Sequence, residues 1–170
     1  MIPKGILPSD LEDSAFIAGG YAACPPLAKD LDLWVFVDER VQTLADVRQQ
    51  ILTWLDTEMW PYEEEGGMRQ EFGQVNNYPV SSRKVAVVRS PHMTHPVHIL
   101  VTNSQPADLL ETFDISTHQV AIVFGNVIKG SQWTPVTEPP RMLKNTPTTP
   151  ERMEKIAARF GYSLTPQGVR

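Results

Sequence analysis

The chain has 170 residues, of which 41% are hydrophobic, so it is long enough for one domain with a substantial core. Its formal charge of −5 argues against broad electrostatic attraction to nucleic acid, although a local basic groove remains compatible with it. The single cysteine, Cys24, excludes an internal disulfide framework, and no apolar run suits a signal peptide or a membrane span. We therefore expect a soluble, cytoplasmic protein with no membrane partner.

The first informative segment combines a paired glycine with two carboxylates. Gly19 and Gly20 follow a short apolar run. After nine further residues, Asp30 and Asp32 open a buried strand that we predict over residues 30–37. In a strand, residues two apart point to the same face and lie roughly 6–7 Å apart, so the two carboxylates converge. Aromatic rings follow them on that face, and aliphatic side chains occupy the other face.

This combination predicts a site for a divalent cation and a triphosphate. Adjacent carboxylates repel each other and are costly to desolvate, so a fold retains such a pair mainly where a cation lies between them. Carboxylate oxygens suit Mg²⁺ or Mn²⁺, and Gly19 and Gly20 would let the backbone approach phosphates closely. Each half of the motif also has a simpler interpretation, because paired glycines often form only a turn and Asp-x-Asp is often a solvated strand end.

The middle of the chain predicts a helix and two strands. Thr43 is a credible cap for an amphipathic helix over residues 44–59. The acidic run at 63–67 indicates an exposed loop. Short, β-branched segments at 84–89 and 97–102 predict strands that are joined by a proline-rich connection.

The C-terminal part predicts a further helix. Thr149 is expected to cap it, a proline occupies its first turn and Gly161 terminates it. Arg152, Lys155 and Arg159 recur at positions i, i+3 and i+7, on or near one exposed flank. The simplest interpretation is a solvated basic face.

The pattern of an apolar residue, Gly-Gly, nine residues and then Asp-apolar-Asp-apolar resembles the signature of the nucleotidyltransferase superfamily typified by DNA polymerase beta. The chain resembles its small phage or viral members, specifically over 16–37 and loosely over 97–162. The resemblance implies that residues 1–170 form one α/β (α+β) domain of polymerase beta-like fold, with a mixed open sheet and flanking helices. It implies transfer of a nucleoside monophosphate from a nucleoside triphosphate to an acceptor hydroxyl, in the host cytoplasm if the protein is phage-encoded.

The resemblance also implies roles for particular residues. Asp30 and Asp32 would bind Mg²⁺ or Mn²⁺. Gly19 and Gly20 would cradle the phosphates of the nucleoside triphosphate. Weaker phosphate contacts would come from three cations, Lys29, Arg152 and Lys155. The last two partly match the Thr-x-x-Arg-x-x-Lys-Tyr ending of small phage-type members, with Ile156 in place of the tyrosine.

The sequence departs from the family at the third acid. Two-metal phosphoryl transfer needs a further carboxylate to share the second ion and help deprotonate the attacking hydroxyl. In the family this acid lies on a strand beside the Asp-x-Asp strand, but the strand predicted at 97–102 carries His98 there. Asp114, between a predicted helix at 106–112 and a predicted strand at 119–124, is the nearest substitute as a catalytic and metal-binding acid. Asp114 equally suits a turn or bonds to backbone amides.

Two other classes of function stay open. The missing acid at position 98 favours a binding or regulatory protein that keeps the fold without efficient chemistry. The four histidines suggest a zinc-dependent hydrolase as a further hypothesis, although no His-Glu-x-x-His pattern accompanies them. They are His92, His95, His98 and His118. For the enzyme, an RNA end, a protein side chain and a small molecule are all candidate acceptors.

Overall fold

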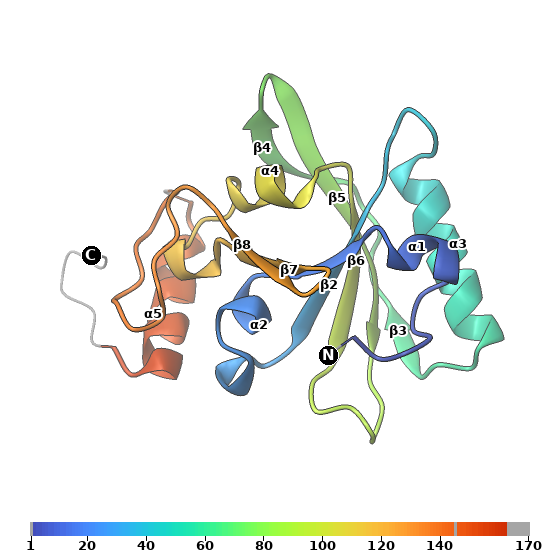
Figure 1. Cartoon of the computed structure of the whole chain (residues 1–170), viewed down its shortest axis with the longest axis horizontal. Coiled ribbons are helices and arrows are strands. Elements are labelled where there is room, and N and C mark those ends of the chain that lie inside the picture. Colours follow the sequence, from blue (N-terminus) through green and yellow to red (C-terminus); the bar gives the residue numbers. More distant parts are fainter. Residues whose placement is uncertain (1, 145, 163–170) are drawn as a thin grey trace.

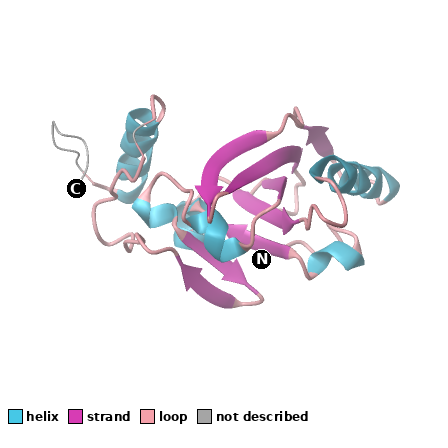
Figure 2. Cartoon of the chain, turned by 90° about the horizontal axis from the view of Figure 1, so that it is seen from above, coloured by secondary structure: helices cyan, strands magenta, loops and turns pink. Residues whose placement is uncertain are grey.

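The computed structural model describes residues 2–144 and 146–162. Within them, eight strands form one sheet, and the two longest helices, α3 and α5, lie at opposite ends of the molecule (Figure 1). Figure 2 shows the same separation from above. The strands are β1 (Ala15–Ala18), β2 (Leu31–Phe36), β3 (Tyr62–Glu64), β4 (Gln70–Val75), β5 (Tyr78–Val88), β6 (Val97–Thr102), β7 (Val120–Val123) and β8 (Asn126–Lys129). The α-helices are α1 (Ser9–Glu12), α2 (Gly20–Ala23), α3 (Leu44–Thr57), α4 (Pro106–Leu110) and α5 (Thr149–Phe160).

The sheet is mixed and open, as expected for an α+β protein. Its strands follow the order β3-β5-β6-β2-β1-β7-β8, and β4 pairs with β5 outside this path. Only β2 and β6 are parallel among the described pairings. Because parallel neighbours need a long crossover, the chain between them carries α3 and the β3 to β5 strands. The pairing places β2 in the middle of the sheet.

The alternation predicted for β2 is confirmed, and it divides the interior into two cores. Leu31, Leu33 and Val35 are buried in one core, together with the apolar stripe of α3. Trp34 and Phe36 face the second core, to which α4 contributes two buried leucines. Two-residue periodicity explains the separation, since odd and even positions of a strand point to opposite faces.

Helix α3 begins where its cap predicts and ends two residues early. The hydroxyl of Thr43 accepts a hydrogen bond from the backbone amide of Asp46 at 3.0 Å, which satisfies one of the free donors of the first turn. The helix ends at Thr57 instead of at residue 59. Met59 has a φ of 58°, which cannot continue a right-handed helix.

The long hairpin of β4 and β5 is the main element that the sequence analysis missed. Its strand β5 begins at residue 78, six residues before the predicted strand, and β4 pairs with it. Asn76 and Asn77 form the two-residue connection with φ values of 52° and 66°, the left-handed geometry that favours tight hairpins. The predicted acidic loop is wrong in part, because Tyr62–Glu64 form the edge strand β3 against β5.

Helix α5 packs on a small cluster of its own. Thr148 occupies the N-cap position, one residue before the predicted cap, and Gly161 ends the helix with a φ of 81° as expected. Met153 and Ile156 are buried against Ile115. Among the described residues, no helix has both the length and the apolar character needed to cross a membrane.

Candidate active site

The glycine pair forms the turn between β1 and α2. Gly19 has a φ of 93°, a backbone conformation that residues with a Cβ rarely adopt. Its backbone amide donates a hydrogen bond to the carbonyl of Val120 at 3.1 Å. A Cβ on Gly19 would lie 3.8 Å from Oδ2 of Asp32. A Cβ on Gly20 would lie 3.7 Å from the ring of His118. The turn therefore presents a surface without side chains directly beside Asp32.

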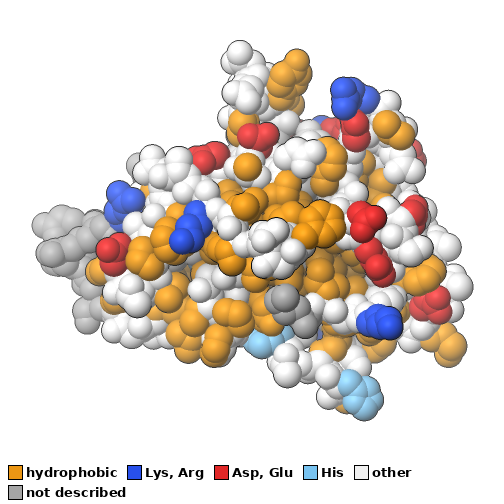
Figure 3. Space-filling view, viewed as in Figure 1, with side chains coloured by type: hydrophobic (Ala, Val, Ile, Leu, Met, Phe, Trp, Pro, Cys, Tyr) orange, Lys and Arg blue, Asp and Glu red, His pale blue; other side chains and the backbone are white. Residues whose placement is uncertain are grey.

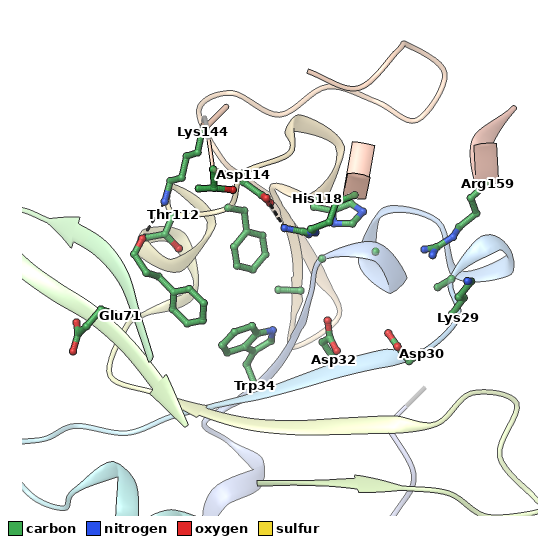
Figure 4. Close-up of a pocket in the computed structure, with 18 residues that line it drawn as sticks. Lys29, Asp30, Asp32, Trp34, Glu71, Thr112, Asp114, His118, Lys144 and Arg159 are labelled. Atoms are coloured by element: carbon green, nitrogen blue, oxygen red, sulfur yellow. Dashed lines mark hydrogen bonds and ion pairs between the residues drawn. The ribbon is translucent and has the colours of Figure 1, made fainter. Parts of the chain in front are cut away.

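Asp32, on β2, and Asp30, directly before this strand, point into the same space (Figure 4). The side chain of Asp30 is 43% exposed, and its Oδ2 lies 3.4 Å from Nε2 of His98. His98 is also the register partner of Asp32 on the parallel strand β6. Burial, and then repulsion by Asp30, raise the pKa of Asp32 to about 6, while His98 and Arg152 act in the opposite direction. The predicted convergence of the two carboxylates is thus present, and it carries an electrostatic cost.

The two acids line a cavity of about 420 Å³. This volume falls within the roughly 300–1,000 Å³ of small-molecule sites. The ionisable and aromatic side chains around it come from β2, β4, α5 and the loops between elements. The acids are Asp30, Asp32, Glu71 and Asp114; the cations are Lys29, Lys144, Arg152 and Arg159; the aromatic rings are Trp34, Phe72 and Phe113.

Separate segments supply the cations of the cavity. Arg152 and Arg159 lie two turns apart on α5, and both line the cavity, as does Lys29. Figure 4 shows Arg159 and Lys29 close to each other at one end of it. Lys155, between the two arginines in sequence, is exposed and is not among the lining residues. Nζ of Lys144 donates to a backbone carbonyl of β4 at 3.0 Å, and burial lowers its pKa. Four cationic and four acidic side chains therefore line the same cavity, and the carboxylate of one of them, Glu71, points away from it (Figure 4).

Asp114 lines the cavity, but its carboxylate is hydrogen-bonded to residues of α5. Its side chain is only 13% exposed and accepts hydrogen bonds from the guanidinium of Arg152 and, at 3.3 Å, from the hydroxyl of Thr149. Across residues 2–144 and 146–162, no three or more His, Cys, Asp and Glu side chains form a group that could hold a metal ion. The structure thus brings Asp114 into the same cavity as Asp30 and Asp32 without joining the three as one ligand group.

The four histidines do not converge in the described structure, which leaves the zinc hypothesis without support. His118 lies over the glycine turn, where burial, and then repulsion by Arg152, lower its pKa to about 4. It is therefore neutral at neutral pH. His98 lies beside the acids of β2, whereas His92 and His95 belong to the connection before β6 and line a different hollow.

Sequence reasoning missed part of this site. Arg159 had a usable signal, because seven residues after Arg152 a helix presents the same face again. His118, Lys144 and Phe72 had none, since each reaches the cavity only through tertiary packing. The sequence predicted the correct face of β2 for Trp34 but not that this ring lines a cavity.

The raised pKa of Asp32 predicts a pH dependence of stability without divalent cations. Between about pH 4 and 6 the folded state holds a proton that the unfolded state has lost, so this stabilisation disappears as the pH rises through 6. Asp32→Asn should therefore exceed the wild type in stability above pH 6, by roughly 1–3 kcal/mol, and lose that advantage below pH 4. Denaturant unfolding of both proteins across this range measures the difference.

Comparing the two proteins removes the contribution of His118, whose lowered pKa gives the opposite slope in both of them. A stability difference that stays constant from pH 4 to pH 7 would contradict the assignment of the raised pKa to Asp32.

The chain matches no known protein family, and no curated protein is significantly similar to it in sequence. The described residues establish an α+β protein with a mixed open sheet and a cavity in which carboxylates and cations meet a glycine turn. Function must therefore be inferred from the chemistry of that cavity.

Proposed function

We propose that this protein is a metal-dependent nucleotidyltransferase of polymerase beta-like fold, which moves a nucleoside monophosphate from a nucleoside triphosphate to an acceptor hydroxyl. The observation that carries the proposal is the meeting of Asp30 and Asp32 with the Gly19 and Gly20 turn in one cavity. A metal–triphosphate site explains both halves of the motif, the glycine turn after β1 and the two acids at the start of β2. A simple turn or a solvated strand end explains only one half.

The donor set fits Mg²⁺ or Mn²⁺. Asp30 and Asp32 offer oxygen ligands, which these hard cations prefer. Burial, and then repulsion by Asp30, raise the pKa of Asp32, and a cation between the two carboxylates would relieve that repulsion. When bound, such an ion would neutralise developing charge on the phosphates and lower the pKa of the attacking hydroxyl.

The chain's other residues would orient the triphosphate. Gly19 and Gly20 leave room for phosphate oxygens next to Asp32, because no side chain fills that space. Lys29 and Arg159 lie near Asp30 in the cavity, where they can neutralise the leaving pyrophosphate (Figure 4). Arg152 can make the same kind of contact if its bond to Asp114 opens.

The distribution of exposed basic side chains bears on the acceptor. On the face shown in Figure 3, Lys and Arg side chains stand apart from one another and form no continuous basic track. Such a track is the usual means of holding a long nucleic acid. An RNA end, a protein side chain and a small molecule are therefore all candidate acceptors.

A labelling experiment tests the proposal without knowledge of the acceptor. The protein is incubated with a cell extract, Mg²⁺ or Mn²⁺ and each nucleoside triphosphate in turn, labelled at the α- or the γ-phosphate. We expect the α-label to enter a new product and the γ-label to leave as pyrophosphate. No product above a heat-inactivated control would contradict nucleotidyl transfer, and transfer of the γ-label would indicate a kinase instead.

A second candidate is a nucleotide-binding or regulatory protein of the same fold without efficient chemistry. Two observations favour it: His98, not an acid, faces Asp32 across β2 and β6, and Asp114 is already paired with Arg152. This candidate predicts binding of Mg²⁺ with a nucleoside triphosphate but no labelled product with any extract.

A further inference from the structure

The cavity has two chemically different ends. Asp30, Asp32 and Trp34 succeed one another at two-residue spacing along the same face, so the cavity runs along β2. Lys29 and Arg159 lie at the Asp30 end, whereas Trp34 marks the other end (Figure 4). One end therefore suits phosphates and the other suits an apolar group.

Three aromatic rings make up the apolar end. The ring centroid of Trp34 lies 6.0 Å from that of Phe72, on β4, and 6.1 Å from that of Phe113, before η2 (Ser116–His118). Trp34 is only 5% exposed and forms the floor, while Phe72 and Phe113 are half-buried and line the cavity. The rings belong to three segments that are distant in sequence, yet all border the same space as the acids.

We propose, on the basis of the nucleotidyltransferase assignment, that these rings form the slot for the nucleobase and that the triphosphate extends from Asp32 toward Lys29 and Arg159. One two-residue step of β2, roughly 6–7 Å, separates Asp32 from Trp34, a distance that a ribose bridges between an α-phosphate and its base. Aromatic side chains stack on any base, because every base has a π-face. The cavity of about 420 Å³ has room for a ligand of this class.

A polar group beside the rings suits the edge of a base. Within the described residues Lys144 donates one hydrogen bond, to the carbonyl of Phe72, and its ammonium carries two further N–H groups. The carboxylate of Glu71 is paired with Arg69 and points away from the rings (Figure 4). The remaining neighbours of the rings are apolar side chains of the second core. An orientation with the phosphates at the aromatic end would leave their charges against this apolar surface, which is unfavourable.

Binding of a nucleoside triphosphate and of inorganic tripolyphosphate, both with Mg²⁺, separates the two ends. Tripolyphosphate has the phosphates without the nucleoside, so the rings should matter only for the nucleotide. Phe72→Leu and Phe113→Leu remove a ring but keep an apolar side chain. We expect each to weaken nucleotide binding by about 5- to 100-fold and to leave tripolyphosphate binding unchanged.

Two further variants serve as controls in the same titrations. Arg159→Gln should weaken the binding of both ligands, because it removes a phosphate contact. Tyr78 lies on the same hairpin as Phe72, is 76% exposed and is outside the cavity. Tyr78→Leu should therefore change the binding of neither the nucleotide nor tripolyphosphate. Retained tripolyphosphate binding also shows that the leucine variants are folded.

The outcomes distinguish the slot from the enzyme assignment. If both leucine variants bind the nucleotide as tightly as the wild type does, the nucleobase slot is wrong and the nucleotidyltransferase proposal is unaffected. An equal loss of nucleotide and tripolyphosphate binding in them would assign the rings a purely structural role. Failure of the wild type to bind either ligand with Mg²⁺ or Mn²⁺ would overturn the nucleotidyltransferase proposal and the slot together.

Discussion

If the proposed nucleotidyl transfer depends on a metal ion at Asp30 and Asp32, Asp32→Asn should lower its rate by about 10³-fold or more, because such an ion would contribute several kcal/mol of transition-state stabilisation. Asp30→Asn should have an effect in the same direction, since both carboxylates point into the same cavity. The isosteric amide keeps the shape of the side chain and removes the charge. Transfer of an α-labelled monophosphate, measured on purified variants, gives the rates.

Asp38→Asn is the matched control for these variants. Asp38 lies beyond the opposite end of β2, outside the cavity, with its carboxylate bonded to Arg40. It should therefore transfer the label at the wild-type rate. Normal turnover in both Asp30→Asn and Asp32→Asn would show that the chemistry does not depend on a metal held by these two carboxylates.

The second large effect is expected at Asp114. In the free protein its carboxylate is paired with Arg152, and a triphosphate that attracts this guanidinium would release the carboxylate to accept the proton of the attacking hydroxyl. Asp114→Asn should then lower kcat by roughly 10²-fold with little change in KM. Arg152→Gln should mainly raise KM, because it would remove the proposed phosphate contact, which would be made in both the ground state and the transition state.

Lys155→Gln controls for the charge of α5, because Lys155 is exposed and outside the cavity. Its kinetics should match those of the wild type. If Asp114 only anchors the helix, Asp114→Asn will turn over normally with a lowered melting temperature. That result would exclude Asp114 as the proton acceptor and move the search for the third acid elsewhere in the chain.

Local pattern was sufficient for the elements that position the acids. The two-residue alternation after Asp32 predicts both faces of β2, and the bounds of β6 were predicted correctly because turn residues flank a short β-branched run. Thr43 was recognised as a cap because its hydroxyl can accept a hydrogen bond from a backbone amide of the first turn, here that of Asp46, three residues later. In each case the decisive interaction is local or follows from side-chain periodicity.

Long-range pairing explains what the sequence left unpredicted. Asp114 and Arg152 are 38 residues apart, so their ion pair depends on how α5 packs on the cluster of Ile115. Lys144 meets β4, 72 residues away, and β4 itself has mostly exposed side chains that give it no apolar periodicity. The cavity is therefore a tertiary feature around a motif that is itself local.

The melting temperature with Mg²⁺ and a nucleoside triphosphate tests most directly whether Asp30 and Asp32 hold a metal–triphosphate complex. At a ligand concentration of about 100 times Kd, preferential binding to the folded state should raise the wild-type melting temperature by roughly 5–10 °C. In Asp30→Asn and Asp32→Asn most of this increase should disappear, while the melting temperature without ligand stays the same or rises because a repulsive pair is relieved. An increase in both variants equal to that of the wild type would contradict the site.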